Sequence, residues 1–166
     1  MTIPRWMVRL ILGIGFMSAF MGAMPFVIAH WGVGIDTQRN PSNPFRLYLH
    51  CKMDRNYTPG TYAPFPMIGF APLIPDGTIF VKRIGATEGD RLELTQNVLS
   101  VNGRPVATVN PIILAKAGLP SSRLEGVEIV PPGFALMLGA SPDSFDSRYY
   151  GLVPLNRLAG TAVPLW

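Results

Sequence analysis

The chain has very little from which to build a metal centre or a disulfide. It holds one cysteine and two histidines in 166 residues. A single cysteine, Cys51, excludes an intrachain disulfide and any multi-cysteine metal site. His50 is its neighbour, but adjacent residues of a strand point to opposite faces, so a Cys/His pair is not expected there. The sequence therefore predicts no metal site.

Charged residues are also scarce. They make up 14% of the chain, against 48% hydrophobic residues, whereas about 25% is usual in a soluble domain. The net charge of +4 comes from Lys and Arg residues scattered singly, which argues against nucleic acid as a partner. A basic face beside anionic lipid headgroups is the easier interpretation. We expect a protein that contacts membrane lipids and binds no nucleic acid.

One long segment has no charge at all. No Asp, Glu, Lys or Arg occurs in the 26 residues between Arg9 and Asp36, and about 20 apolar residues are enough to cross a bilayer as a helix. We predict a single transmembrane helix from Leu10 to Ala29. Arg5 and Arg9 precede it, so the positive-inside rule places the N-terminus in the cytoplasm and the chain after Asp36 on the other side.

Two other interpretations of this segment are a cleaved signal peptide and a buried core helix. The apolar part of a signal peptide usually runs about 7–15 residues, and a small domain rarely hides so long an apolar helix. A retained anchor is therefore favoured. The chain then divides into residues 1–35, the cytoplasmic tip and anchor, and residues 36–166, an exported domain.

The exported part alternates short apolar runs with turn signals. "TIFVKRIGA" (78–86) has the period of a strand, and "GFALMLGA" (133–140) is a compact apolar run after two prolines. "NVLSVNGRPVA" (97–107) carries Asn102-Gly103 between two short strands, a strong hairpin signal. The fold class predicted is all-β, an antiparallel domain behind one N-terminal transmembrane helix.

A Pro- and Gly-rich segment with many apolar residues covers positions 56–77. It suggests a substrate groove or a membrane-contacting rim. Phe65 and Phe70 are candidates to bind a hydrophobic part of the substrate and to limit the access of water.

One lysine stands out in the strand at 78–86. The period of two places Phe80, Lys82 and Ile84 on one face, and Arg83 on the other. A lysine there either extends to solvent or is buried. Burial disfavours its charged form and makes it a base near neutral pH.

A lysine base needs a nucleophile to deprotonate. Neither histidine is placed to act as the base for a serine nucleophile. The sequence alone does not choose among the serines outside the anchor, which are Ser42, Ser100, Ser121, Ser122, Ser141, Ser144 and Ser147.

Three motifs occur in a characteristic order behind the anchor: "VKRIGATEGDRLEL" (81–94), "VNG" (101–103) and "SPDSFDSRYYG" (141–151). In this order they resemble the membrane-bound Ser/Lys peptidases of the type I signal peptidase family. The likeness is closest to the conjugative-transfer, TraF-type branch that matures pilins, whose members often end in "PLW", as this chain does (164–166). The resemblance implies an antiparallel signal-peptidase-like β domain.

The family nucleophile lies just after the anchor in a pattern like S-x-P-x-G-L-Y. "SNPFRLY" (42–48) matches it at its serine, proline, leucine and tyrosine, and departs from it at Arg46, where Gly is usual. A rival, "NYTPGTY" (56–62), would put Asn56 at the nucleophile position and give an inactive enzyme. The "GTYAPF" stretch at 60–65 resembles the next family block, which favours Ser42.

By this resemblance Ser42 is the nucleophile and Lys82 the general base, a pair whose chemistry needs no cofactor. The oxyanion is stabilised by the backbone N–H of Ser42 and by a side chain two residues earlier, here Asn40.

The resemblance also gives roles to the last motif. Ser144 orients the lysine through a hydrogen bond, while Asp146 and Arg148 pair to hold the loop against the site. An ion-paired turn without direct chemistry is an equally good interpretation of Asp146 and Arg148.

The leading function is a serine endopeptidase anchored in the bacterial inner membrane, with its catalytic domain in the periplasm. The expected substrate is an exported pilin precursor of a conjugative type IV secretion system, with other conjugation proteins as further partners. Water would release a linear product, and the substrate's own amino terminus would give a cyclic one by transpeptidation. The alternatives are a general type I signal peptidase and a catalytically idle component of the secretion machine.

Overall fold

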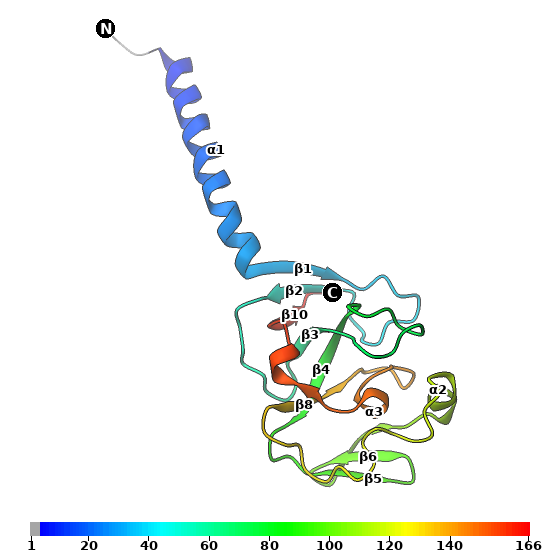
Figure 1. Ribbon diagram of the computed structural model, residues 1–166. Coiled ribbons are helices and arrows are strands. Elements are labelled where there is room, and N and C mark those ends of the chain that lie inside the picture. Colours follow the sequence, from blue (N-terminus) through cyan, green and yellow to red (C-terminus); the bar gives the residue numbers. More distant parts are fainter. Residues whose placement is uncertain (1–3) are drawn as a thin grey trace.

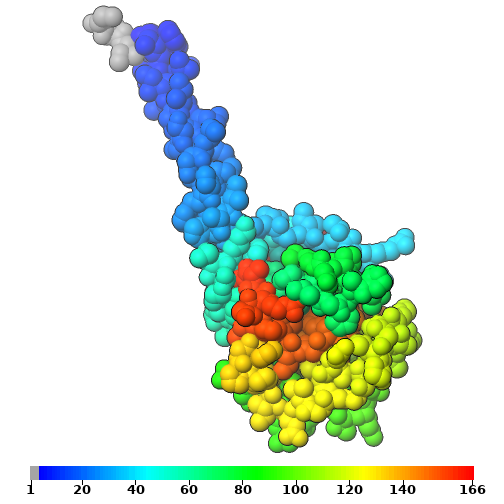
Figure 2. All heavy atoms as spheres, in the orientation of Figure 1, coloured from blue at the N-terminus to red at the C-terminus, as the bar shows by residue number. Residues whose placement is uncertain are grey.

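A long apolar helix projects from a small β domain (Figures 1 and 2). The computed structural model describes residues 4–166. The helix, α1, runs from Arg5 to His30, contains the predicted segment Leu10–Ala29, and is long and apolar enough to cross a membrane. None of its residues is buried against the domain, so the buried core helix is ruled out for this segment.

The domain is built on a seven-stranded sheet in which every pair of neighbours is antiparallel. Its strand order is β1-β2-β10-β3-β4-β8-β9. The strands are β1 (Trp31–Ile35), β2 (Leu47–Cys51), β3 (Tyr62–Pro66), β4 (Ile79–Thr87), β8 (Phe134–Leu138), β9 (Val153–Pro154) and β10 (Thr161–Pro164). The last strand, β10, thus lies between β2 and β3, which brings the C-terminal segment beside the start of the domain (Figure 1).

A second sheet and three short helices complete the domain. The sheet has the order β5-β6-β7, with β5 at Leu92–Thr95, β6 at Val98–Val101 and β7 at Arg104–Thr108. The helices are α2 (Pro111–Lys116), α3 (Ser147–Tyr150) and the 3-10 helix η1 (Leu155–Arg157). The predicted all-β antiparallel class is confirmed.

Local sequence explains the hairpin between β6 and β7. Asn102 and Gly103 connect the strands with φ angles of 51° and 75°. Two successive positive φ angles produce a tight turn whose twist matches that of the strands, and Asn and Gly tolerate them best.

The apolar core has two parts. One includes Phe65, Met67 and Ile84, and the other includes Leu99 and Leu136. Phe65 is 1% exposed, so the expectation that it lines a substrate groove is wrong: it packs in the core.

The anchor and the sheet meet at His30 and Trp31, where α1 ends and β1 begins. The division of the chain after residue 35 stays a prediction, and residues 1–3 of its first part lie outside the described residues. Residues 31–35, on the N-terminal side of that division, pair with β2 in the sheet.

Candidate active site

Lys82 lies on β4 with its side chain inside the domain. Lys82 and Ile84 lie on one face of β4 and Arg83 on the other, as the period of two predicts. Of the two alternatives for Lys82, the structure shows burial. Lys82 is 3% exposed, and its Nζ donates a 2.8 Å hydrogen bond to the Oγ of Ser144. Burial lowers the pKa of Lys82 to about 8, and the nearby carboxylate of Asp146 partly opposes this shift. A neutral amine is therefore accessible near physiological pH.

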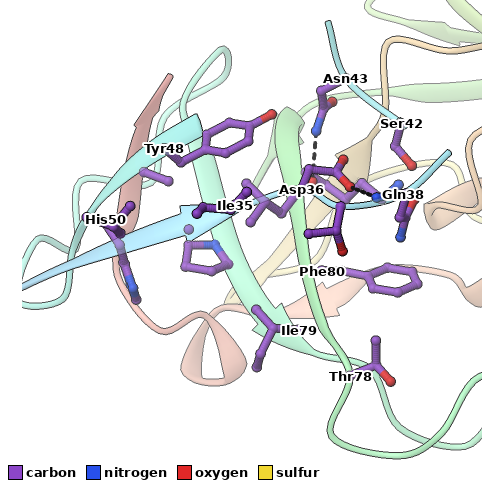
Figure 3. Close-up of a pocket in the computed structure, with 17 residues that line it drawn as sticks. Ile35, Asp36, Gln38, Ser42, Asn43, Tyr48, His50, Thr78, Ile79 and Phe80 are labelled. Atoms are coloured by element: carbon purple, nitrogen blue, oxygen red, sulfur yellow. Dashed lines mark hydrogen bonds between the residues drawn. The ribbon is translucent and has the colours of Figure 1, made fainter. Parts of the chain in front are cut away.

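Two hydrogen bonds fasten the loop that carries Ser42, one at Ser42 and one at the next residue. The carbonyl oxygen of Ser42 accepts a 3.0 Å hydrogen bond from the N–H of Ser141. Next to it, the buried Asn43 donates from Nδ2 to the carbonyl oxygen of Val81 at 2.9 Å, drawn as a dashed line in Figure 3. Val81 precedes Lys82 on β4, so this bond holds the serine loop against the lysine strand.

Ser42 and Lys82 both line one cleft of about 470 Å³, called here the first cleft. Strand residues Ile35, Tyr48 and Ile79 form part of its wall, and Figure 3 shows several of these side chains around it. Within residues 4–166 the structure records no hydrogen bond between Ser42 and Lys82. Catalytic hydrogen bonds are often long without substrate, so a shared cleft is the relevant relationship.

The two nucleophile candidates differ in position. Ser42 lines the cleft with Lys82, whereas Asn56 is exposed in the β2–β3 connection and does not line it. The geometry therefore favours the motif at 42–48 over the rival at 56–62.

Ser144 is the serine in direct contact with Lys82, but it is 2% exposed. A peptide cannot reach a side chain buried to that degree without displacing its neighbours. Ser42 is half-buried and faces the cleft, so it is better placed to attack a substrate, and Ser144 is better placed to orient the lysine.

Asp146 and Arg148 form the ion pair that the resemblance implies. Their side chains are 0% and 1% exposed, and Arg148 Nη2 lies 2.7 Å from Asp146 Oδ2. Arg148 also donates to the carbonyl oxygens of Thr108 at 2.5 Å and Ser144 at 3.1 Å. Asp146 Oδ2 accepts from the N–H of Gly139 at 2.9 Å. The pair therefore binds together the loop that contains Ser144, while its role in catalysis stays a prediction.

Gly139 is a site residue that sequence reasoning missed. A Cβ built on Gly139 would overlap the Ser144 hydroxyl and would lie 2.5 Å from the Ser144 Cβ and 2.9 Å from the Ser42 carbonyl oxygen. The absence of a side chain there lets three segments meet. No local pattern marks this glycine, because the requirement comes from Ser144 and the backbone of Ser42 together.

Arg46, the departure from the family pattern, has a structural role. Its Nη1 donates to the carbonyl oxygen of Gln38 at 3.1 Å, and its own carbonyl oxygen accepts from the N–H of Asp36 at 2.8 Å. Its N–H donates to the carbonyl oxygen of Trp166 at 2.6 Å. The Arg46 side chain thus holds the segment that lines the first cleft, and its backbone joins that segment to the C-terminal segment through bonds that any residue other than proline can make.

Asn40 lies beside a smaller hollow of about 370 Å³, called here the second hollow. Ser42 lines it as well, so the two spaces meet at this serine. Asn40 is exposed, and its role as oxyanion donor stays a prediction.

The comparison with known families fits this arrangement of a serine, a buried lysine and an apolar helix. The family described as signal peptidase, peptidase S26, matches residues 7–166. The chain belongs to this signal peptidase family. Membership confirms the resemblance seen in the sequence and supports a serine peptidase, and together with α1 it fits a membrane-anchored protein.

Individual relatives have modest identity. A probable conjugal transfer protein TraF of Sinorhizobium fredii (strain NBRC 101917 / NGR234) is 29% identical over 167 residues, 92% of this chain and 87% of that protein. The conjugal transfer protein TraF of Agrobacterium fabrum (strain C58 / ATCC 33970) is 32% identical over 97 residues, 58% of this chain and 50% of that protein. Signal peptidase I of Bacillus caldolyticus is 35% identical over 92 residues, 49% of this chain and 50% of that protein.

Among solved structures, a signal peptidase I from Enterococcus faecalis V583 covers 63% of this chain and 94% of its own, with a TM-score of 0.42 and 23% identity.

Proposed function

We propose that this protein is a membrane-anchored serine endopeptidase that processes an exported pilin precursor of a conjugative type IV secretion system. The observation that carries the proposal is the buried Lys82, whose pKa is lowered to about 8, in the same cleft as Ser42. The two relatives named TraF, a conjugal transfer protein, support a role in conjugation.

In the proposed reaction, Ser42 Oγ attacks the carbonyl carbon of the scissile peptide bond while neutral Lys82 takes its proton. The C–N bond breaks, and Lys82 passes the proton to the leaving amine. The backbone N–H of Ser42 and the amide of Asn40 stabilise the oxyanion. The acyl-enzyme then reacts with water to give a linear product or with an amino terminus to give a cyclic one.

The proposed topology follows from charge. Arg5 and Arg9 lie at the start of α1, so the positive-inside rule places this end in the cytoplasm. The catalytic domain then lies in the periplasm, anchored in the inner membrane, where it meets exported substrates and other conjugation proteins.

The test is the intact mass of the pilin encoded alongside this protein, measured in cells that carry wild type, Ser42→Ala or Lys82→Ala. Ser100→Ala on β6 and Lys116→Ala at the end of α2 are matched controls away from both spaces. We expect a shortened pilin in wild type and controls and uncut precursor in the two site variants. A pilin one water lighter than the linear fragment would demonstrate cyclisation.

Identical pilin in all strains would overturn the proposal and favour an idle component of the machine. Processing of many unrelated preproteins would favour a general signal peptidase instead.

A further inference from the structure

The second hollow adjoins the proposed nucleophile on the side away from Lys82. Ser42, Gln38, Thr78 and Phe80 border both spaces and are labelled in Figure 3, while Lys82 lines the first cleft and not the second hollow. A peptide that crosses a serine nucleophile places its acyl part on one side and its amine part on the other. Because two spaces meet at Ser42, one can hold the acyl part of the substrate and the other its amine part.

The lining of the second hollow combines apolar walls with one charge. Ile74 and Pro75 of the β3–β4 connection and the ring of Phe145 supply apolar surface. Phe145 is held in place by Phe70, with ring centroids 5.2 Å apart and nearly perpendicular planes. Among the described residues that line the hollow, Asp143 is the one with a charge, so the hollow suits a cation next to an apolar side chain.

Asp143 is positioned by the turn that also contacts both proposed catalytic residues. The N–H of Ser144 donates to the carbonyl oxygen of Ser141 at 3.0 Å and closes this turn. At one end, Ser141 donates to the Ser42 carbonyl oxygen, and at the other, Ser144 accepts from Lys82. The backbone on both sides of Asp143 is therefore held relative to both residues, and the exposed Asp143 side chain lines the second hollow.

The orientation of this carboxylate is also set by a neighbour. Asn110 Nδ2 donates to Asp143 Oδ1 at 3.2 Å, and Asn110 itself caps the N-terminus of α2. This contact occupies Oδ1. Within residues 4–166 the structure records no hydrogen bond to Oδ2, which leaves that oxygen for a ligand.

We propose that the second hollow is the subsite for the amine side of the substrate, and that Asp143 binds the amino terminus of the peptide that leaves or enters the acyl-enzyme. The inference rests on the proposed function. The occupant is a peptide α-ammonium group followed by an apolar residue, which matches the carboxylate and the apolar walls.

The transfer step balances without another reagent. The ammonium captured by Asp143 loses one proton to water as it moves to the ester. Its nitrogen then forms the new C–N bond, the surplus proton goes to Lys82, and Lys82 passes it to Ser42 Oγ as the C–O bond breaks. Holding the amine beside the ester raises its effective concentration over that of water.

The test uses the full chain in detergent with an activated ester of a short peptide as acyl donor. The acceptor is the peptide amide Ala-Leu-Gly-NH₂, and its matched counterpart carries a hydroxyl in place of the α-amino group. Mass spectrometry of the products gives the half-saturating concentration of each acceptor. Asp143→Asn is compared with Asp143→Glu, which keeps the charge, and with Glu88→Gln, which removes an exposed charge from the β4–β5 turn.

We expect Asp143→Asn to raise the half-saturating concentration of the amine acceptor roughly threefold to fivefold, as for an exposed ion pair. The half-saturating concentration of the hydroxyl acceptor should change less than that of the amine acceptor. Asp143→Glu should restore much of the wild-type value for the amine acceptor, and Glu88→Gln should leave that value unchanged. Equal shifts for both acceptors, or no shift for either, would overturn the subsite. Absence of any acyl-enzyme in wild type would overturn the proposed function, and the subsite with it.

Discussion

The Nζ of Lys82 donates a 2.8 Å hydrogen bond to the Oγ of Ser144, and both side chains are buried. A buried ammonium is costly unless it is paired, and a hydroxyl is a weaker partner than a carboxylate. The contact therefore orients the amine without fixing its charge. This combination suits a group that must take up and release a proton near neutral pH.

The first prediction concerns the pH dependence of acylation. Burial lowers the pKa of Lys82 to about 8, and the active form is the neutral amine. The acylation rate should therefore rise as the pH increases through the pKa and level off above it, by roughly fiftyfold between about pH 6 and pH 8. The acylation rate is measured from the pre-steady-state release of the leaving group of an ester substrate. A rate that does not change over this range would exclude Lys82 as the base.

The second prediction separates orientation from nucleophilic attack. Ser144→Ala removes a hydrogen-bond acceptor from Lys82, so the charged form loses support and the midpoint of the pH profile should shift to lower pH. We expect kcat to fall roughly tenfold to a hundredfold with a small change in KM, because general-base efficiency depends on geometry. Ser100→Ala on β6 is the matched control.

Full loss of acylation in Ser144→Ala, together with an active Ser42→Ala, would reverse the roles of the two serines. That result would require Ser144 to become accessible, since it is 2% exposed in this structure.

The face on which Lys82 lies follows from local sequence, because a strand of period two places it beside Ile84 and opposite Arg83. Whether the lysine extends to solvent or is buried does not follow from that period. The turn at Asn102-Gly103 is also predictable from local sequence, because an adjacent Asn and Gly between two short strands are typical of a tight hairpin turn. The choice of Ser42 as nucleophile came from resemblance, because composition and spacing do not distinguish one loop serine from another.

Long-range contacts explain what the sequence did not predict. The insertion of β10 between β2 and β3, and the bond from Asn43 to Val81, join residues far apart in the chain. Likewise, the need for glycine at position 139 arises from the side chain of Ser144 and the backbone of Ser42 together. No local pattern encodes such contacts.

The third prediction concerns the buried ion pair of Asp146 and Arg148. Asp146→Asn leaves the guanidinium of Arg148 buried without its counter-charge, so the free energy of unfolding should fall by roughly 3–5 kcal/mol. The exposed pair of Arg91 and Glu93, 2.9 Å apart with side chains 69% and 46% exposed, provides the control. Glu93→Gln should cost under about 1 kcal/mol. Urea unfolding of the full chain in detergent measures both, and similar losses would contradict a special role for the buried pair.

The last prediction tests the close approach at Gly139. A Cβ at this position would overlap the Ser144 hydroxyl and lie 2.9 Å from the Ser42 carbonyl oxygen, so Gly139→Ala must push the two serine-bearing segments apart. A displacement of about 1 Å can cost roughly a hundredfold in rate, and overpacking costs about 1–3 kcal/mol of stability. We therefore expect the acylation rate to fall roughly a hundredfold, while the protein stays folded with a free energy of unfolding lower by about 1–3 kcal/mol.

The same substitution at an open position supplies the comparison. Gly89 in the β4–β5 turn has space for a Cβ, although its φ of 83° makes alanine strained there. Gly89→Ala should therefore reduce stability to a similar extent while the acylation rate of the folded protein stays near wild type. Equal losses of rate in both variants would mean that the Gly139 effect comes from general destabilisation. A selective loss in Gly139→Ala would show that the spacing of Ser42, Ser144 and Lys82 depends on the missing side chain.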